Sequence, residues 1–328
     1  MPEIEPKLIV VWRITERCTL TCPFCANDAS LGGLRREVVV EQVERFGCIL
    51  GEFRQRTGRR VLLSWLGGEP LLWPPLFAVS RRLHDDFGLE LSLTTNGTTL
   101  NLPEAQEELL ASFSEITVSI DGFAPLHDQL RGWPGGWQQI REAVIALADR
   151  RTEKRLPKLR ANIVLMRDNL PLFAELCETL AMWGIDEITF NQLGGRERPE
   201  FFPDHRLRPE DAKQLATMLP ALRAKLAARG VRLCGSDDYL TRISASSHNQ
   251  PLPIADCAPG QRYLFIDECG RMAPCSFTGA EFGIPIDDIA SAADLLALPQ
   301  RFAAMREQSL AAACADCPST QVFAKFLN

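Results

Sequence analysis

Short apolar runs alternate with longer amphipathic stretches along the first two-thirds of the chain. Runs of this length predict buried strands, and apolar residues that recur every three or four positions predict helices. The predicted strands are Leu8–Ile14, Val61–Leu66, Leu89–Thr95, Glu115–Ile120, Leu159–Met166 and Asp186–Gln192. The predicted helices cover residues 38–54, 74–87, 103–112, 137–150, 170–183 and 209–229.

Six strand-plus-helix units in a row predict an α/β fold with a parallel sheet, because parallel neighbours need a crossover connection between them. The strands are nearly continuous in apolar character, which is typical of strands buried on both faces. The pattern alone allows an open doubly wound sheet or a partly closed barrel. In either fold we expect the active site where loops leave the carboxyl ends of the strands.

The regular alternation is expected to stop after about Gly235. A stretch rich in serine and proline, residues 244–253, predicts a connector. Beyond it, Tyr263–Ile266 and Arg271–Ala273 predict the two arms of a hairpin. We therefore expect two domains, which cover residues 1–235 and 236–328.

The composition narrows the possible partners. The chain has 328 residues, 46% hydrophobic and 24% charged, as is typical of a folded globular protein. Its net charge is −6 and it has no long basic block, so we expect no nucleic-acid partner. It has no apolar run of membrane-spanning length and no secretory-signal pattern, so we expect no membrane partner. Eleven cysteines without such a signal indicate the cytoplasm and metal binding rather than disulfides.

Three cysteines, Cys18, Cys22 and Cys25, directly follow the first predicted strand. Thiolates this close in sequence suit a soft metal or an iron–sulfur cluster, because one loop can wrap several sulfurs around the same core. Structural sites usually have four protein ligands, so three ligands indicate a metal with one open position. From spacing alone, a zinc loop or a chance grouping of cysteines is the alternative.

The spacing Cys18-x-x-x-Cys22-x-x-Cys25, with Phe24 before the third cysteine, resembles the cluster loop of radical S-adenosylmethionine (SAM) enzymes. The resemblance implies a partial (β/α)6 TIM-like barrel, in which the three cysteines bind a [4Fe-4S] cluster and SAM binds the fourth iron. It further implies that an electron from a flavodoxin- or ferredoxin-type donor cleaves SAM to a 5'-deoxyadenosyl radical. That radical then takes a hydrogen atom from the substrate.

The second predicted strand runs into Gly67, Gly68, Glu69 and Pro70. Paired glycines allow a ligand to approach the backbone closely, and the glutamate offers a carboxylate to a cation. An ordinary Gly-Gly turn would have the same sequence. The position of this turn, one unit after the cysteine loop, resembles the family motif that binds the amino group of SAM.

The third and fourth predicted strands end near Asn96-Gly97 and Asp121-Gly122 turns, with Ser119 just before the second. Such turns are common in any protein, but their recurrence resembles the SAM site of the family, where Ser119 is a candidate for the ribose or carboxylate of SAM. Arg131 ends an H-D-x-x-R segment that resembles one in peptide-modifying members. There the arginine is expected near the SAM carboxylate, whereas the alternative is a solvated arginine at a helix end.

Two amides, Asn162 and Asn191, fall within the fifth and sixth predicted strands. Buried amides need hydrogen-bond partners. The adenine of SAM or the substrate could supply them, and so could an ordinary network within the core.

Four further cysteines, Cys257, Cys275, Cys314 and Cys317, lie in the second predicted domain. By spacing alone they could form a zinc site. The pattern Cys-x12-Gly-x4-Cys followed by Cys-x-x-Cys resembles the SPASM/twitch extension of radical SAM enzymes. Full SPASM domains continue with more cysteines, and their lack here implies a twitch-like domain with one auxiliary [4Fe-4S] cluster. A cluster with four cysteine ligands has no open iron, so it would relay electrons.

The remaining cysteines are Cys48, Cys177, Cys234 and Cys269. The first two fall on apolar helix faces and are predicted to lie in the core. Family members that epimerise their substrates use a cysteine to return a hydrogen atom to the substrate radical. Cys269 and Cys234 are our candidates for such a donor.

The resemblance implies an enzyme that tailors a peptide or a small natural product by oxidation, cross-linking or epimerisation. An alternative within the family is a dehydrogenase or epimerase of amino sugars or cyclitols. An alternative from another class is a non-catalytic iron–sulfur or zinc-binding scaffold. The first predicted strand begins at Leu8, so we expect that recognition of a leader peptide would need a separate protein.

Overall fold

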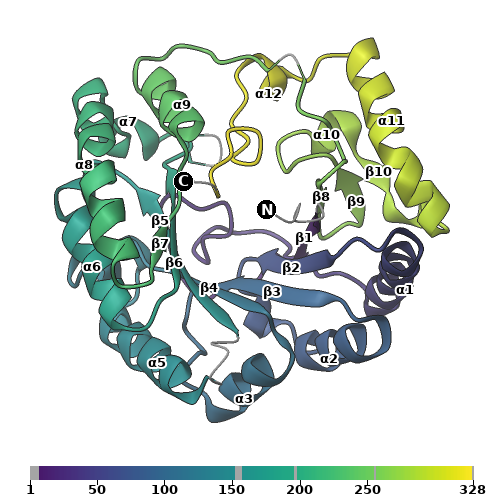
Figure 1. Ribbon diagram of the computed structural model, residues 1–328, viewed down its shortest axis with the longest axis horizontal. Coiled ribbons are helices and arrows are strands. Elements are labelled where there is room, and N and C mark those ends of the chain that lie inside the picture. The colour runs from purple at the N-terminus through teal and green to yellow at the C-terminus, as the bar shows by residue number, and fades with distance from the viewer. Residues whose placement is uncertain (1–6, 152–156, 196–197, 255, 327–328) are drawn as a thin grey trace.

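The computed structural model describes residues 7–151, 157–195, 198–254 and 256–326 (Figure 1). Residues 1–6, on which the expectation of no secretory signal partly rests, lie outside these ranges. Ten strands form one sheet in the order β10-β9-β8-β1-β2-β3-β4-β5-β6-β7. They are β1 (Leu8–Thr15), β2 (Val61–Gly67), β3 (Glu90–Thr95), β4 (Glu115–Ser119), β5 (Lys158–Leu165), β6 (Glu187–Gln192), β7 (Arg232–Leu233), β8 (Tyr263–Ile266), β9 (Arg271–Ala273) and β10 (Ile284–Pro285).

The helices are α1 (Val40–Thr57), α2 (Leu76–Phe87), α3 (Pro103–Ser112), α4 (Leu126–Arg131), α5 (Gly136–Arg150), α6 (Phe173–Met182), α7 (Phe202–His205), α8 (Pro209–Ala227), α9 (Asp237–Ser247), α10 (Gly279–Phe282), α11 (Ala292–Gln308) and α12 (Ala312–Ala315). Short 3-10 turns cover Pro70–Leu72, Leu170–Leu172 and Ile286–Asp288. None of the helices in the described part of the chain is long and apolar enough to cross a membrane.

Strands β1 to β7 run parallel, and the major helices form an arc outside the curved sheet (Figure 1). The sheet does not close, because β7 and β10 stand at its two ends. Helices follow each of the strands β1 to β6. The expected α/β fold with a partial (β/α)6 barrel is therefore confirmed.

The alternation does not stop where we expected. β7 and α9 form one more, shorter unit, and α9 occupies the first part of the expected connector. A two-residue strand followed by a serine-rich helix gives too short a periodic pattern to be recognised in the sequence. The predicted hairpin is confirmed as β8 and β9. β8 pairs in parallel with β1, so one sheet continues across the boundary expected at residue 235.

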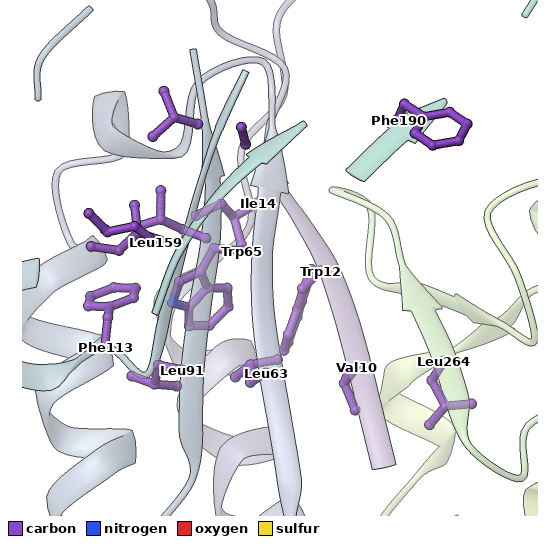
Figure 2. Packing of buried hydrophobic residues seen from close by; sticks show 14 of the residues in the cluster. Val10, Trp12, Ile14, Leu63, Trp65, Leu91, Phe113, Leu159, Phe190 and Leu264 are labelled. Carbon is purple, nitrogen blue, oxygen red and sulfur yellow. The ribbon is translucent and has the colours of Figure 1, made fainter. Parts of the chain in front are cut away.

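The largest packed region lies between the sheet and the outer helices (Figure 2). In β1, Val10, Trp12 and Ile14 point into it and are fully buried. The Trp12 ring packs edge-on against Phe46 of α1, with ring centroids 5.7 Å apart. This alternating apolar face fixes the register of β1 and so the point where the cysteine loop begins.

The inner face of the sheet is more polar than we expected. Buried and half-buried positions alternate along β1 and β5, so burial on both faces is wrong for these strands. On β5 the half-buried positions include Arg160, Asn162 and Val164. Polar side chains are accommodated because the inside of the barrel holds ion pairs and amide networks rather than an apolar layer.

An ion-pair network, which we call the barrel floor, joins the amino-terminal ends of β4 to β7. Arg160 lies 3.1 Å from a carboxylate oxygen of Glu115 and 2.6 Å from one of Glu187. Lys158 and Arg232 add further contacts to Glu187. Burial alone would raise the pKa of Glu187, but these cations hold it below its usual range. The floor therefore balances its buried charge among the strands themselves.

Cys177 is buried as predicted, but Cys48 is exposed on α1, so the prediction for Cys48 is wrong. The residues beside Cys48 in sequence lie on the buried faces of α1, whereas the Cys48 side chain points to solvent.

Candidate active site

The cysteine loop follows β1 at the carboxyl end of the barrel, as predicted. The backbone N–H of Cys25 donates to the carbonyl of Cys22 over 3.1 Å, which bends the loop. Each of the three sulfurs also has a nitrogen neighbour: Asn96 Nδ2 is 3.5 Å from Cys18 Sγ, Arg131 Nη1 is 3.9 Å from Cys22 Sγ, and the Asn27 N–H nitrogen is 3.4 Å from Cys25 Sγ.

This donor set suits an iron–sulfur cluster, because each of the three sulfurs has a nitrogen neighbour. No three His, Cys, Asp or Glu side chains in the described ranges are arranged to hold a single ion. A [4Fe-4S] cube is larger than an ion and spreads its thiolate ligands apart, and hydrogen bonds to the ligand sulfurs are typical of its surroundings. The residues present are therefore compatible with the cluster that the fold implies.

Arg131 is buried between Asp121 and the cysteine loop. Its Nη2 lies 2.5 Å from Asp121 Oδ2, and its guanidinium lies 5.6 Å from the centre of the Phe24 ring. Burial raises the pKa of the Cys22 thiol to about 12, and the charge of Arg131 opposes that increase. Arg131 thus belongs to the support of the loop, and the solvated helix-end alternative is wrong.

Asp121 links the fourth strand to the fifth. Its Oδ1 accepts from the Val164 N–H at 2.7 Å, and its own N–H donates to His127 Nδ1 at 3.2 Å. Burial, and then Arg131, lower the pKa of His127 to about 3, so this ring stays neutral and accepts. Asn169 donates to the Asp121 carbonyl at 2.7 Å. Sequence reasoning had not assigned Asn169, because a turn asparagine has no spacing that marks it.

Gly67 and Gly68, at the end of β2, allow a close contact between two backbone segments of the protein. A Cβ atom on Gly67 would collide with the carbonyl oxygen of Thr15, and one on Gly68 with that of Arg17. The Gly68 and Glu69 N–H groups donate to the same two carbonyls, both at 2.8 Å. The close backbone approach is therefore to the segment that leads into Cys18, and it fixes that segment in place.

The Glu69 carboxylate is fully buried and already satisfied. One oxygen accepts from Thr95 Oγ1 at 2.8 Å and from the Leu71 N–H at 3.1 Å, and the other accepts from the Asn96 N–H at 2.6 Å. Burial raises the pKa of Glu69 to about 7, against these hydrogen bonds, which lower it. Glu69 holds the turn that carries Asn96, and Pro70 begins a 3-10 turn behind it.

Asn162 and Asn191 share a network inside the barrel. Asn191 Nδ2 donates to Asn162 Oδ1 at 3.1 Å, and Lys325 Nζ lies 2.7 Å from Asn191 Oδ1. Asn162 is also in register with Ser119 across β4 and β5. The two amides therefore do belong to a polar network within the protein, which was the alternative to a ligand contact. Lys325 is part of this network, and no motif in the sequence indicated it.

The four cysteines of the last part of the chain lie near one another. Burial raises the pKa of Cys257, and the thiols of Cys275 and Cys314 raise it further, while Arg306 opposes them. Burial likewise raises the pKa of Cys317, with further increases from the other three thiols. Such electrostatic coupling needs short separations, so the chain brings the four predicted ligands to one region.

The two candidate hydrogen donors lie in different surroundings. Cys269 is exposed on the turn between β8 and β9, where Arg36 Nη1 lies 2.9 Å from its sulfur. Cys234 is buried after β7, and its thiol donates to the Phe326 carbonyl at 3.7 Å. Burial, and then Glu187, raise the pKa of Cys234 to about 11.

The model of the Radical SAM superfamily matches residues 12–191, which is more than half of the chain and includes the cysteine loop and the turn of Glu69. The chain therefore belongs to the Radical SAM superfamily. Its fold and the three sulfurs at the barrel mouth agree with this assignment.

Curated relatives cover most of the chain. The PqqA peptide cyclase of Xanthomonas campestris pv. campestris is 26% identical over 98% of this chain and 82% of its own length. The AdoMet-dependent heme synthase of Oleidesulfovibrio alaskensis is 25% identical over 84% of this chain and 71% of its own length.

Solved structures show the same fold. Streptococcus suis SuiB bound to its precursor peptide SuiA has a TM-score of 0.68 and is 16% identical, covering 98% of this chain and 71% of that chain. The native anSMEcpe structure with bound AdoMet has a TM-score of 0.66 and is 14% identical, covering 98% of this chain and 89% of that chain.

Proposed function

We propose that this protein reductively cleaves SAM to a 5'-deoxyadenosyl radical, abstracts a hydrogen atom from its substrate and tailors a peptide with help from one auxiliary [4Fe-4S] cluster. The observation that carries the proposal is the loop of three thiols at the barrel mouth, each with its own nitrogen neighbour. The three thiols would hold an iron–sulfur cluster, which would supply the electron that cleaves SAM.

The residues around the loop would bind the cofactors in distinct ways. Cys18, Cys22 and Cys25 would ligate the cluster, and Arg131 would hold Cys22 while itself fixed by Asp121. The SAM contacts would come from the strand ends beside the loop. These candidates are Phe24, Gly67, Gly68, Glu69, Pro70, Asn96, Ser119, Asp121, Arg131, Asn162 and Asn191.

The auxiliary cluster would lie in a twitch-like domain over residues 236–328, with Cys257, Cys275, Cys314 and Cys317 as its ligands. The mutual influence of these thiols on their pKa values supports one shared site. Arg306 Nη1, 3.6 Å from Cys257 Sγ, would offer a hydrogen bond to the site, as Arg131 does to the first. Such a cluster would accept or relay single electrons.

A peptide substrate is favoured because one curated relative is a PqqA peptide cyclase and SuiB is bound to a precursor peptide. The reaction would be an oxidation, a cross-link or an epimerisation, with Cys234 or Cys269 as hydrogen donor in the last case. A small molecule is the second candidate, because another relative is named a heme synthase. A flavodoxin- or ferredoxin-type donor, and a separate peptide-recognition protein, complete the proposed partners.

The test of cofactor content is anaerobic reconstitution with iron and sulfide. We expect about eight irons per chain, as two cubane clusters require, and conversion of SAM to 5'-deoxyadenosine after reduction. The control is Cys48→Ala, which changes an exposed cysteine outside both sets and should leave the iron content unchanged. Zinc in place of iron, or no cleavage of SAM, would contradict the proposal and favour a binding scaffold.

The substrate class needs a separate experiment. We would express the protein together with each small open reading frame beside its gene and compare the peptides by mass spectrometry. A mass change that needs the cysteine loop would identify a peptide substrate. Unchanged peptides, combined with SAM cleavage, would favour the small-molecule alternative.

A further inference from the structure

A segment near the end of the chain, residues 319–326, lies against the inner face of the sheet. Ser236 Oγ donates to the Phe323 carbonyl at 2.8 Å, and the Phe326 ring centre is 5.1 Å from the Arg160 guanidinium. Figure 1 shows this yellow part of the chain inside the curve of the sheet, beside β5 and β6. The segment thus carries its side chains into the barrel.

Lys325 is the basic residue of this segment, and only 4% of it is exposed. Its Nζ lies 3.2 Å from Asn162 Oδ1 and 2.7 Å from Asn191 Oδ1. Within the described residues, no carboxylate forms an ion pair with it, since the nearby Glu187 is taken by Arg160 and Arg232. A buried ammonium without an anionic partner is costly.

The hydrogen-bond geometry suits a neutral amine. An ammonium has three N–H donors, whereas a neutral amine has two donors and one lone pair. The two amide oxygens of Asn162 and Asn191 satisfy the two donors of a neutral amine. The lone pair of a neutral amine is then available to accept a proton, and the Phe326 ring centre lies 5.1 Å from Nζ as a further neighbour.

On balance, burial and the charged and titratable neighbours also lower the pKa of Lys325. Burial, and then Arg160 on β5, lower the pKa of Lys325 to about 7, while Cys234 and Glu187 raise it by less. A large fraction of such a lysine is neutral at neutral pH, in contrast to an ordinary lysine with a pKa near 10.4. General bases work best when their pKa lies near the working pH.

We propose that Lys325 is the catalytic proton acceptor of this enzyme, so that its substrate is oxidised by two electrons rather than epimerised. Asn162, its partner, is in register with Ser119, so Lys325 lies beside the strand layer of the expected SAM contacts. The inference rests on the proposed function, and it selects dehydrogenation or oxidative cross-linking from the reactions considered above.

The atoms and electrons balance as follows. One hydrogen atom leaves a substrate carbon for the 5'-deoxyadenosyl radical. The substrate radical would then lose one electron to the proposed auxiliary [4Fe-4S] cluster, and the atom that bonds to the radical carbon would lose one proton to the Lys325 amine. The lysine becomes an ammonium, and the substrate gains one new bond between the radical carbon and its neighbour or partner. An epimerisation would return a hydrogen atom instead and would release no proton.

The test is competitive labelling of the reconstituted enzyme with formaldehyde and cyanoborohydride, followed by mass spectrometry of each lysine. The reagents modify only the neutral amine, so the pH dependence of labelling reports the pKa of each lysine that the reagents reach. The chain has six lysines, and Lys225, which pairs with Glu178 at the surface, is the internal control. From pH 7 to pH 9 we expect labelling of Lys325 to rise about twofold and that of Lys225 about a hundredfold.

Two results would overturn the inference. A rise of about a hundredfold at Lys325 would show an ordinary, charged lysine. No labelling of Lys325 in the folded enzyme, with normal labelling after denaturation, would show that small molecules do not reach it. Iron content and SAM cleavage, measured on the same preparation, separate a failure of the proposed function from a failure at Lys325.

A substitution at Asn191 tests the geometry. Asn191→Asp places a carboxylate 2.7 Å from the amine and stabilises the ammonium. Labelling of Lys325 should then rise steeply from pH 7 to pH 9, as for an ordinary lysine. Asn191→Ser adds no charge, so labelling of Lys325 should still rise only about twofold over this pH range. A shallow response in Asn191→Asp would mean that the amide does not contact Lys325 and would also overturn the inference.

Discussion

Buried carboxylates lie at both ends of the barrel, and their partners differ. At the floor, Glu187 is 3% exposed and is surrounded by the cations of neighbouring strands. At the mouth, Glu69 is fully buried and its oxygens accept from backbone N–H groups and a hydroxyl instead. The pKa of Glu187 lies below its usual range, and that of Glu69 is raised to about 7.

This difference indicates that the floor contributes to the stability of the barrel and the mouth to its function. Charges at the floor neutralise one another and join strands, which is the stabilising role expected at the amino-terminal face of such barrels. At the mouth, Glu69 and Asp121 position loops, and each of the three sulfurs of the cysteine loop has a nitrogen neighbour. Substitutions at the two ends should therefore separate into effects on unfolding and effects on iron binding.

The largest effect is expected for Cys22→Ala. This change removes one of three ligands, so the iron content should fall from about eight to about four and formation of 5'-deoxyadenosine should fall below detection. Cys257→Ala is the matched variant in the other set of cysteines. It should also lose about four irons but keep SAM cleavage. Equal loss of SAM cleavage in both variants would show that the two sites are not separate.

The floor is tested by Arg160→Met. Arg160 bridges Glu115 and Glu187, so its removal leaves buried carboxylates short of a cation and should cost about 3–5 kcal/mol of unfolding free energy. Arg81→Met, which breaks an exposed pair with Glu108, should leave the unfolding free energy nearly unchanged. Urea unfolding measures both. A small loss in Arg160→Met would remove the distinction between the floor and an ordinary surface pair.

The two glutamates also predict opposite pH effects. The pKa of Glu69 is raised to about 7 by burial, so its contribution is fully present below the unfolded pKa and is lost as pH rises towards 7. Each proton involved changes stability by up to about 1.4 kcal/mol per pH unit. The lowered pKa of Glu187 gives a contribution that is present above the unfolded pKa and lost as pH falls.

Glu69→Gln should flatten the stability profile between about pH 4.5 and 7, and Glu187→Gln should flatten it on the acid side. Urea unfolding over pH 3 to 8, without SAM, is the measurement. The wild-type profile minus that of each variant isolates the contribution of one group. A Glu69 contribution that increases with pH would mean that the hydrogen bonds from Asn96 and Leu71 dominate over burial.

Much of this molecule was predictable from short-range patterns. The six strands and their helices follow from apolar periodicity, and the Cys18–Cys25 loop follows from the local spacing that a cluster needs. The hairpin of β8 and β9 was predicted as well, because its arms are adjacent in the chain. Each of these features depends on residues that lie within a few tens of positions of one another, and over that range the sequence pattern predicts structure.

The contacts that were missed join distant parts of the chain. Lys325 reaches Asn162 across 163 residues, and β8 pairs with β1 although more than 200 residues separate them. Arg131, which we expect near the carboxylate of SAM, pairs with Asp121 in the structure, and the sequence did not indicate this partner. Such partners depend on which side chains the barrel brings to one layer, and neither composition nor spacing encodes that arrangement.

The last prediction concerns Gly132, which lies beneath the cysteine loop. Gly132 has a positive φ of 61°, and a Cβ atom there would collide with the side chain of Thr21. Gly135 has a similar φ of 76° but open space around it. Both changes to alanine should cost about 1 kcal/mol for the backbone, and Gly132→Ala should cost about 1–3 kcal/mol more for the contact.

A double substitution sharpens this comparison. Thr21→Ala removes the hydroxyl that the new Cβ would meet, so it should recover most of the extra cost of Gly132→Ala and none of the cost of Gly135→Ala. Iron content should follow the same order, because the displaced Thr21 lies next to Cys22. Equal destabilisation by the two glycine variants would show that the loop yields easily and that α4 does not hold it in place.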